Sequence, residues 1–174
     1  MQPAVRPALR PRLVAIAPTA AEAVQGAGGW LFDQALAGWD VTVITAEQAD
    51  HRSLRILGVR GYTLEAALAY QVDGACVSAI ALSAAMLESD ERVRRMVLAA
   101  VDSGLPELRL WGAGDGTPAE LAGRAESVSH RLSAAARAFK AQALAAAAIG
   151  KDGLAGTEVF RRGEFRHLSL AASR

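Results

Sequence analysis

Four polar residues at or just beyond the ends of predicted strands are candidates for binding a small molecule. They are Thr19, Thr45, Tyr62 and Asp115. In an open α/β sheet, ligands bind in the crevice outside the carboxyl ends of the strands. Hydroxyl, phenol and carboxylate groups orient a polar ligand there by hydrogen bonds. We therefore expect Thr45, Tyr62 and Asp115 to meet in a cleft at this end of the sheet, with Thr19 at the end of the first strand.

The common motifs for nucleotides, metals and nucleophilic catalysis are absent from the sequence. A dinucleotide fingerprint would lie between the first strand and the first helix, where residues 18–22 read PTAAE instead. His51, His130 and His167 are far apart and have no metal-ligand spacing. Neither a phosphate-binding loop nor a G-x-S-x-G elbow occurs. The sequence therefore predicts no cofactor and no metal site.

Length and composition favour one soluble domain with a sizeable core. The chain has 174 residues, of which 52% are hydrophobic and 21% charged, and this excludes a disordered chain. No apolar stretch reaches the roughly 18 residues of a membrane span, and the start lacks the pattern of a secretory signal. We expect a cytoplasmic protein with a flexible basic tail over 1–12, an α/β domain over 13–150 and an extension over 151–174.

Short apolar runs predict the strands. Runs too short for a helix, or rich in β-branched residues, indicate buried strands over 13–17, 41–45 and 108–111, with a weaker one over 54–57. Trp30 and Trp111 lie in apolar stretches, so we expect both to be buried.

Hydroxyl and acidic residues at helix starts predict the helices. Thr19 with Glu22 forms a capping-box pattern before a helix that runs to about Ala37. Further helices are predicted over 63–71, 75–87 and 89–102, the second because its length and alanine content favour helix over strand. The strongest start is the TPAE sequence at 117–120, from which a helix could run to Ala148.

The order of these elements predicts a three-layer α/β fold. It has a mostly parallel sheet of four or five strands with helices on both faces, a long C-terminal helix and a possible terminal hairpin around Gly163. This order resembles that of bacterial receiver domains. The resemblance covers topology only, because Pro18 and Thr19 replace the acidic pair after the first strand, and Gly112 stands where a receiver has lysine.

The long helix also predicts a homodimer. Six residues are spaced alternately by four and three, as in the seam of packed helices: Leu121, Ala125, Val128, Leu132, Ala135 and Phe139. A straight helix over 118–148 would be roughly 46 Å long, so part of it would project from the domain and pair with a second copy. Two alternatives are that the seam packs on this protein's own sheet and that the helix breaks near Ala141.

The absence of ready-made catalytic motifs favours a non-catalytic regulatory or partner-binding module. A protein partner could bind at the C-terminal extension. The alternative is a small-molecule enzyme or ligand-binding protein whose site lies at the carboxyl ends of the strands, since scattered catalytic residues leave no motif. Nucleic-acid binding is disfavoured because Arg92, Arg94 and Arg95 are offset by neighbouring acids.

Overall fold

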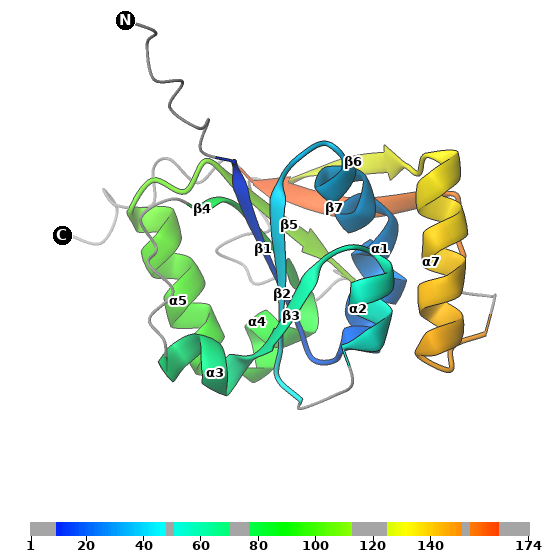
Figure 1. Cartoon of the computed structure of the whole chain (residues 1–174). Coiled ribbons are helices and arrows are strands. Elements are labelled where there is room, and N and C mark those ends of the chain that lie inside the picture. The colour runs from blue at the N-terminus through cyan, green and yellow to red at the C-terminus, as the bar shows by residue number, and fades with distance from the viewer. Residues whose placement is uncertain (1–9, 48–50, 70–76, 113–124, 151–153, 164–174) are drawn as a thin grey trace, which may run out of the picture.

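The computed structural model describes residues 10–47, 51–69, 77–112, 125–150 and 154–163. Their strands form a seven-stranded sheet in the order β3-β2-β1-β4-β5-β7-β6 (Figure 1). The strands are β1 (Arg12–Ala17), β2 (Asp40–Thr45), β3 (Arg60–Thr63), β4 (Val77–Ser83), β5 (Glu107–Trp111), β6 (Ala125–Arg131) and β7 (Thr157–Gly163). The first five are parallel to one another, whereas β7 runs antiparallel to both β5 and β6.

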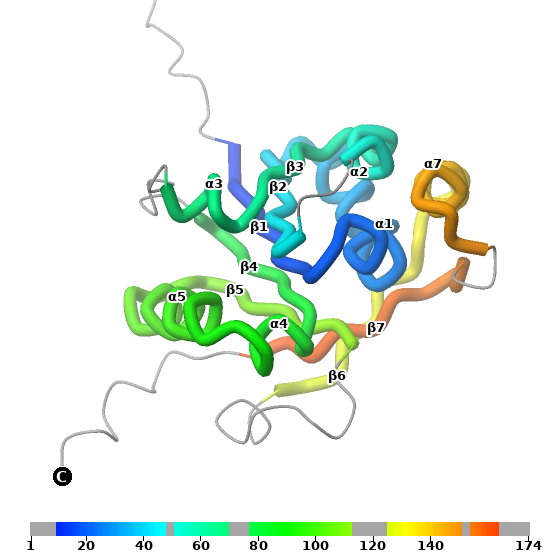
Figure 2. The backbone as a smooth tube through the Cα atoms, turned by 90° about the horizontal axis from the view of Figure 1, so that it is seen from below, coloured from blue at the N-terminus to red at the C-terminus, as the bar shows by residue number. Residues whose placement is uncertain are grey.

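Helices cover both faces of the sheet (Figure 2). One face carries α1 (Ala20–Leu36), α2 (Arg52–Ile56) and α7 (Ala134–Ala146), and the other carries α3 (Leu64–Ala69), α4 (Ala84–Ser89) and α5 (Glu91–Asp102). Side chains of a strand alternate between the two faces, so Leu13 and Ala15 join one core cluster while Val14 and Ile16 join the other. Two separate cores therefore hold the sheet from either side.

The helices and strands whose sequence signals lie within a few neighbouring residues were predicted correctly. Thr19 caps α1, its hydroxyl accepting from the Glu22 backbone N–H at 3.0 Å. Asp90 caps α5 through the N–H of Arg92 at 2.9 Å. The strands predicted over 13–17, 41–45 and 108–111 and the helices beginning near 19, 63 and 89 are confirmed within the described residues. Trp30 and Trp111 are buried, as expected.

The sheet has more strands than predicted, and its order is not that of a receiver domain. Receivers have the strand order 2-1-3-4-5, whereas here β1 lies between β2 and β4 in the order 3-2-1-4-5. The prediction of four or five strands is wrong because β3, β4 and β6 were missed. Residues 54–57 belong largely to helix α2, and the helix predicted over 75–87 is strand β4 followed by α4. Because β4 is central and covered on both sides, its apolar run lacks the alternation of a half-exposed strand.

The prediction of one long C-terminal helix is wrong, because strand β6 and the shorter helix α7 occupy its place. The predicted dimer seam depended on that helix. Ala125 and Val128 lie in strand β6, and Leu132 is buried between β6 and α7. On α7, Ala135 is exposed and the Phe139 ring stacks on Phe32 of α1, with their centroids 4.7 Å apart. Leu121 lies outside the described residues. The six residues therefore do not share one helix face.

The possible terminal hairpin is only partly tested. Thr157–Gly163 is strand β7, which pairs with β5 and β6, while residues 164–174 lie outside the described part of the chain. The sheet therefore includes residues that were predicted to form a separate extension.

A buried ion pair joins α7 and β7 to the middle of α1. The Lys140 Nζ lies 2.6 Å from the Glu158 Oε1, and the side chains are 1% and 2% exposed. Glu158 also accepts the backbone N–H groups of Gly29 and Trp30, each at 2.8 Å, while Lys140 donates to the Gln25 carbonyl at 2.8 Å. In a regular helix, the Gly29 N–H would bond to the Gln25 carbonyl. Glu158 and Lys140 bind these same two groups, the Gly29 N–H and the Gln25 carbonyl.

Gly29 is required where α1 meets this pair. A Cβ at Gly29 would overlap the Leu132 side chain and lie 3.1 Å from the Glu158 Oε1. The helix can therefore approach β7 closely only with glycine at this position.

Another polar cluster links α1 to the start of α7. The Asp33 carboxylate accepts the Ser133 hydroxyl at 2.6 Å and the Ser133 N–H at 3.2 Å, and its Oδ2 lies 2.8 Å from the His130 Nε2. Ser133 also caps α7 by accepting the Ala136 N–H at 2.9 Å.

Candidate functional site

The order of the strands has its switch point between the carboxyl ends of β1 and β4. Chain connections run from β1 outward to β3 on one side, and from β4 outward to β5 on the other. Such a switch point is where open α/β sheets bind their ligands, because the connecting loops diverge there. Three side chains come together at this place: Glu22 from the first turn of α1, Ser83 from the end of β4 and Trp111 from the end of β5.

Glu22 is the central group of this candidate site. Its Oε1 accepts the indole N–H of Trp111 at 2.9 Å, and that ring is itself buried. Its Oε2 is buried and makes no hydrogen bond of normal geometry with the described residues, although the Ser83 hydroxyl lies close to the carboxylate. A buried carboxylate oxygen without a partner is costly, so this atom is available to a ligand or a proton.

Burial raises the pKa of Glu22 above its ordinary value, because the charged form loses its hydration. Hydrogen bonds from Trp111 and Ser83 favour the carboxylate and lower the pKa, but they do not offset the effect of burial. A carboxyl group with a raised pKa both accepts and donates protons more readily near neutral pH. The arrangement therefore suits general acid and base chemistry.

The packing of α1 fixes Glu22 against Trp111. A Cβ at Gly26, one helical turn after Glu22, would overlap the Trp111 indole. Glycine at this position lets the ring lie flat against the helix, where its N–H reaches the carboxylate.

Thr19 and Thr45, which were predicted to bind a ligand, form hydrogen bonds within the protein. Thr19 lies between β1 and α1, where its hydroxyl caps α1. Thr45 is fully buried, and its hydroxyl donates to the Glu47 carbonyl at 2.9 Å. It also lies 3.2 Å from the His51 Nε2 and 3.5 Å from the Tyr62 carbonyl.

The predicted cleft is therefore not formed by the side chains of Thr45 and Tyr62. The two residues meet only through the Tyr62 backbone, while the Tyr62 side chain lines a hollow with Arg12 and Arg60. Asp115 lies outside the described residues. The His51 ring packs on Gly61, where a Cβ would lie 2.5 Å from the imidazole Cγ.

Sequence reasoning missed the roles of Glu22, Ser83 and Trp111. Glu22 was assigned the second half of a capping box, but in the structure its carboxylate bonds to Trp111 instead of returning to Thr19. The available signal was position: each of the three residues ends a strand or follows one at the switch point. Finding it requires knowing the strand order.

The described residues do not fit a metal centre. They contain no group of three or more His, Cys, Asp or Glu side chains placed to hold a metal ion. Directly after β1, Ala20 and Ala21 offer no ligand atoms, and the Thr19 hydroxyl is occupied as a cap. A stable zinc site needs three or four such ligands.

Within the described part of the chain, no helix is long and apolar enough to span a membrane.

No protein-family model and no curated protein matches the sequence. Solved structures share the fold. The A40926 pseudoaglycone deacetylase superposes with a TM-score of 0.62 at 19% identity, over 90% of this chain and 99% of that chain. N,N'-diacetylchitobiose deacetylase from Pyrococcus horikoshii gives 0.56 at 14% identity, over 88% and 84%. A zinc-inhibited form of teicoplanin deacetylase gives 0.56 at 16% identity, over 77% and 82%. The chain therefore has a deacetylase-like α/β fold.

This fold corrects the predicted functional class. The preference for a non-catalytic, protein-binding module was wrong, because the structures that share the fold are small-molecule deacetylases. They favour the alternative, an enzyme or ligand-binding protein with its site at the carboxyl ends of the strands. The absence of short catalytic motifs was weak evidence, since Glu22 and Trp111 are 89 residues apart and form no local pattern.

Proposed function

We propose that the protein is a small-molecule hydrolase that removes an acyl group from an amine, with its site at the carboxyl ends of β1, β4 and β5. The observation that carries this proposal is the Glu22 carboxyl, whose Oε2 is buried and unpaired at the switch point of the sheet. The deacetylase-like fold supports the reaction class. An N-acetylated sugar is the substrate class to test first, since one structure with this fold is a diacetylchitobiose deacetylase.

The reaction requires one group that moves a proton twice. A water oxygen attacks the amide carbonyl carbon while the Glu22 carboxylate accepts a proton from that water. The bond between the carbonyl carbon and the nitrogen then breaks, and Glu22 returns the proton to the departing amine. The products are a carboxylic acid and a free amine. The raised pKa of Glu22 suits both transfers, because the group is neither a very weak base nor a very weak acid.

Trp111 and Ser83 position the carboxylate for this role. The indole N–H holds Oε1, which leaves Oε2 as the atom that exchanges protons. Burial of the carboxyl keeps its pKa raised although the hydrogen bonds from Trp111 and Ser83 favour the charged form. No step in this scheme uses a metal ion, because the described residues do not fit one.

The test is acetate release from N,N'-diacetylchitobiose by the wild-type chain and by Glu22→Gln. Glutamine keeps an oxygen for the Trp111 N–H but cannot transfer the proton, so we expect the rate to fall by about 10² to 10⁴. Glu47→Gln is the matched control, because Glu47 lies at the same end of the sheet and is exposed. The control should keep the wild-type rate. Equal rates for wild type and Glu22→Gln, or no release by the wild type, would contradict the proposal.

A further inference from the structure

Two adjoining hollows lie on the sheet face that carries α3 and α5. Their volumes are about 420 Å³ and 840 Å³, and both are lined by Val14, Ile44 and Ala67, so one continues into the other. Arg12, the first residue of β1, lines the smaller hollow, whereas Glu22 follows the end of that strand. This groove is therefore separate from the proposed catalytic site.

The larger hollow is lined mainly by apolar side chains. Its floor is formed by side chains of β1, β2 and β4, including Ile16 and Ile80, and its walls by α3 and α5 through Leu64, Leu68 and Met96. An alkyl chain that lies in this hollow would gain free energy in proportion to the apolar area that it removes from water.

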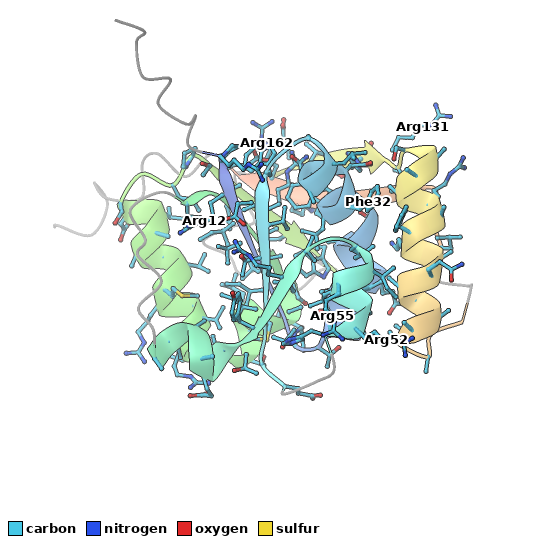
Figure 3. The ribbon with its side chains drawn as sticks, viewed as in Figure 1. Arg12, Phe32, Arg52, Arg55, Arg131 and Arg162 are labelled. Atoms are coloured by element: carbon cyan, nitrogen blue, oxygen red, sulfur yellow. The ribbon has the colours of Figure 1, made fainter. Side chains whose placement is uncertain are left out.

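The smaller hollow adds positive charge to one end of this groove. Arg12 and Arg60 both line it, and both pair with Asp40. The Arg12 and Arg60 side chains remain 36% and 56% exposed. Two guanidinium groups thus share one carboxylate, which leaves an excess positive charge beside the Thr42 and Tyr62 side chains. Figure 3 shows Arg12 at the start of β1, on the side of the sheet where α5 lies.

We propose that this groove binds a single-chain amphiphile with a carboxylate head, such as a fatty acid. The carboxylate lies at Arg12 and Arg60, where the planar guanidinium groups offer paired hydrogen-bond donors. The alkyl chain passes Val14 and Ala67 into the larger hollow. Charge complementarity at one end and an apolar trough beyond it are together what such a molecule requires.

The position of the alkyl chain is tested by calorimetric titration of the full chain with octanoate, decanoate and dodecanoate, each below its micelle concentration. We expect each added methylene to tighten binding about fourfold, which corresponds to ~0.8 kcal/mol per buried CH₂. No measurable binding, or an affinity independent of chain length, would overturn the proposal. A dimeric mass in light scattering together with no fatty-acid binding would also overturn it, because a second copy would then cover the groove.

Charge variants test the head-group position. Arg60→Gln should weaken dodecanoate binding several-fold but leave 1-decanol binding unchanged, while Asp40→Asn should tighten dodecanoate binding by removing the competing carboxylate. Ala67→Trp should block the passage between the hollows and abolish binding of both ligands. Ala135→Trp, at an exposed position of α7 on the opposite face, is the matched control. Equal losses for dodecanoate and decanol with Arg60→Gln would refute the assignment of the head group.

Discussion

Replacing Glu158 by glutamine tests whether the buried ion pair holds α1 against the C-terminal part of the sheet. Glutamine has nearly the same shape, but its one oxygen can replace only one of the two carboxylate oxygens that accept the Gly29 and Trp30 N–H groups. It leaves the Lys140 ammonium buried, with the Gln25 carbonyl as its remaining partner among the described contacts. A buried charge without a countercharge is strongly unfavourable, because the interior does not replace its hydration.

We expect Glu158→Gln to lower the free energy of unfolding by about 3–5 kcal/mol, the usual cost of removing one partner of a buried pair. For a domain of this size, that loss lowers the melting temperature by roughly 6–20 °C. Urea unfolding followed by circular dichroism measures the free energy directly. Lys140→Met should cost a similar amount, since it leaves the Glu158 charge without its cation.

The double variant separates charge from shape. Lys140→Met combined with Glu158→Gln removes both buried charges, so its cost should be smaller than the sum of the single costs by about 1 kcal/mol or more. Glu91→Gln is the control, because Glu91 forms an exposed pair with Arg95 on α5, and we expect a loss below about 0.5 kcal/mol. If Glu158→Gln and Lys140→Met each cost less than about 1 kcal/mol, the pair does not hold the fold as described.

Three further changes test other contacts. Burial raises the pKa of Asp33, but the hydrogen bonds from Ser133 and His130 outweigh it and lower the pKa, so the stability they contribute is complete above the ordinary aspartate pKa. It is lost as the pH falls through the lowered pKa, and Asp33→Asn should reduce the difference between urea unfolding at pH 6 and at pH 3. Trp111→Phe removes a hydrogen bond that lowers the pKa of Glu22, so an NMR titration of that carboxyl should shift to higher pH; an unchanged curve would contradict the contact. Gly29→Ala should cost about 1–3 kcal/mol through overlap with the leucine that it touches, and an unchanged denaturation midpoint would refute the close packing.

The sequence predicted those elements whose signals are local. The caps at Thr19 and Asp90 and the β-branched run of β2 each depend on a few neighbouring residues, and each was predicted correctly. Strand β4 was predicted as helix because a fully covered strand and a short buried helix have the same continuous apolar pattern. Strand β6 was missed because the helix predicted from the TPAE sequence at 117–120 was extended through it, whereas its pairing with β7 joins Val128 to Phe160.

The candidate site could not be predicted for the same reason. The Glu22 pKa is raised by burial in the folded chain, and nothing near Glu22 in the sequence indicates that burial or its contact with Trp111. A site at the carboxyl ends of the strands stays a prediction, and it follows from sheet geometry alone. Which side chains occupy that place depends on the order of the strands, and this is set by long-range packing.

The hydrogen bonds from Gly29 and Trp30 to Glu158 make the completion of α1 depend on synthesis of a much later part of the chain. The Gly29 N–H and its acceptor are separated by 129 residues, so α1 leaves the ribosome long before its partner is made. At about 5–20 residues per second, that interval is roughly 6–26 s. During this time the middle of α1 has only water or its own carbonyls as hydrogen-bond partners. Helix α1 therefore reaches its final hydrogen bonding only after Glu158 has been translated.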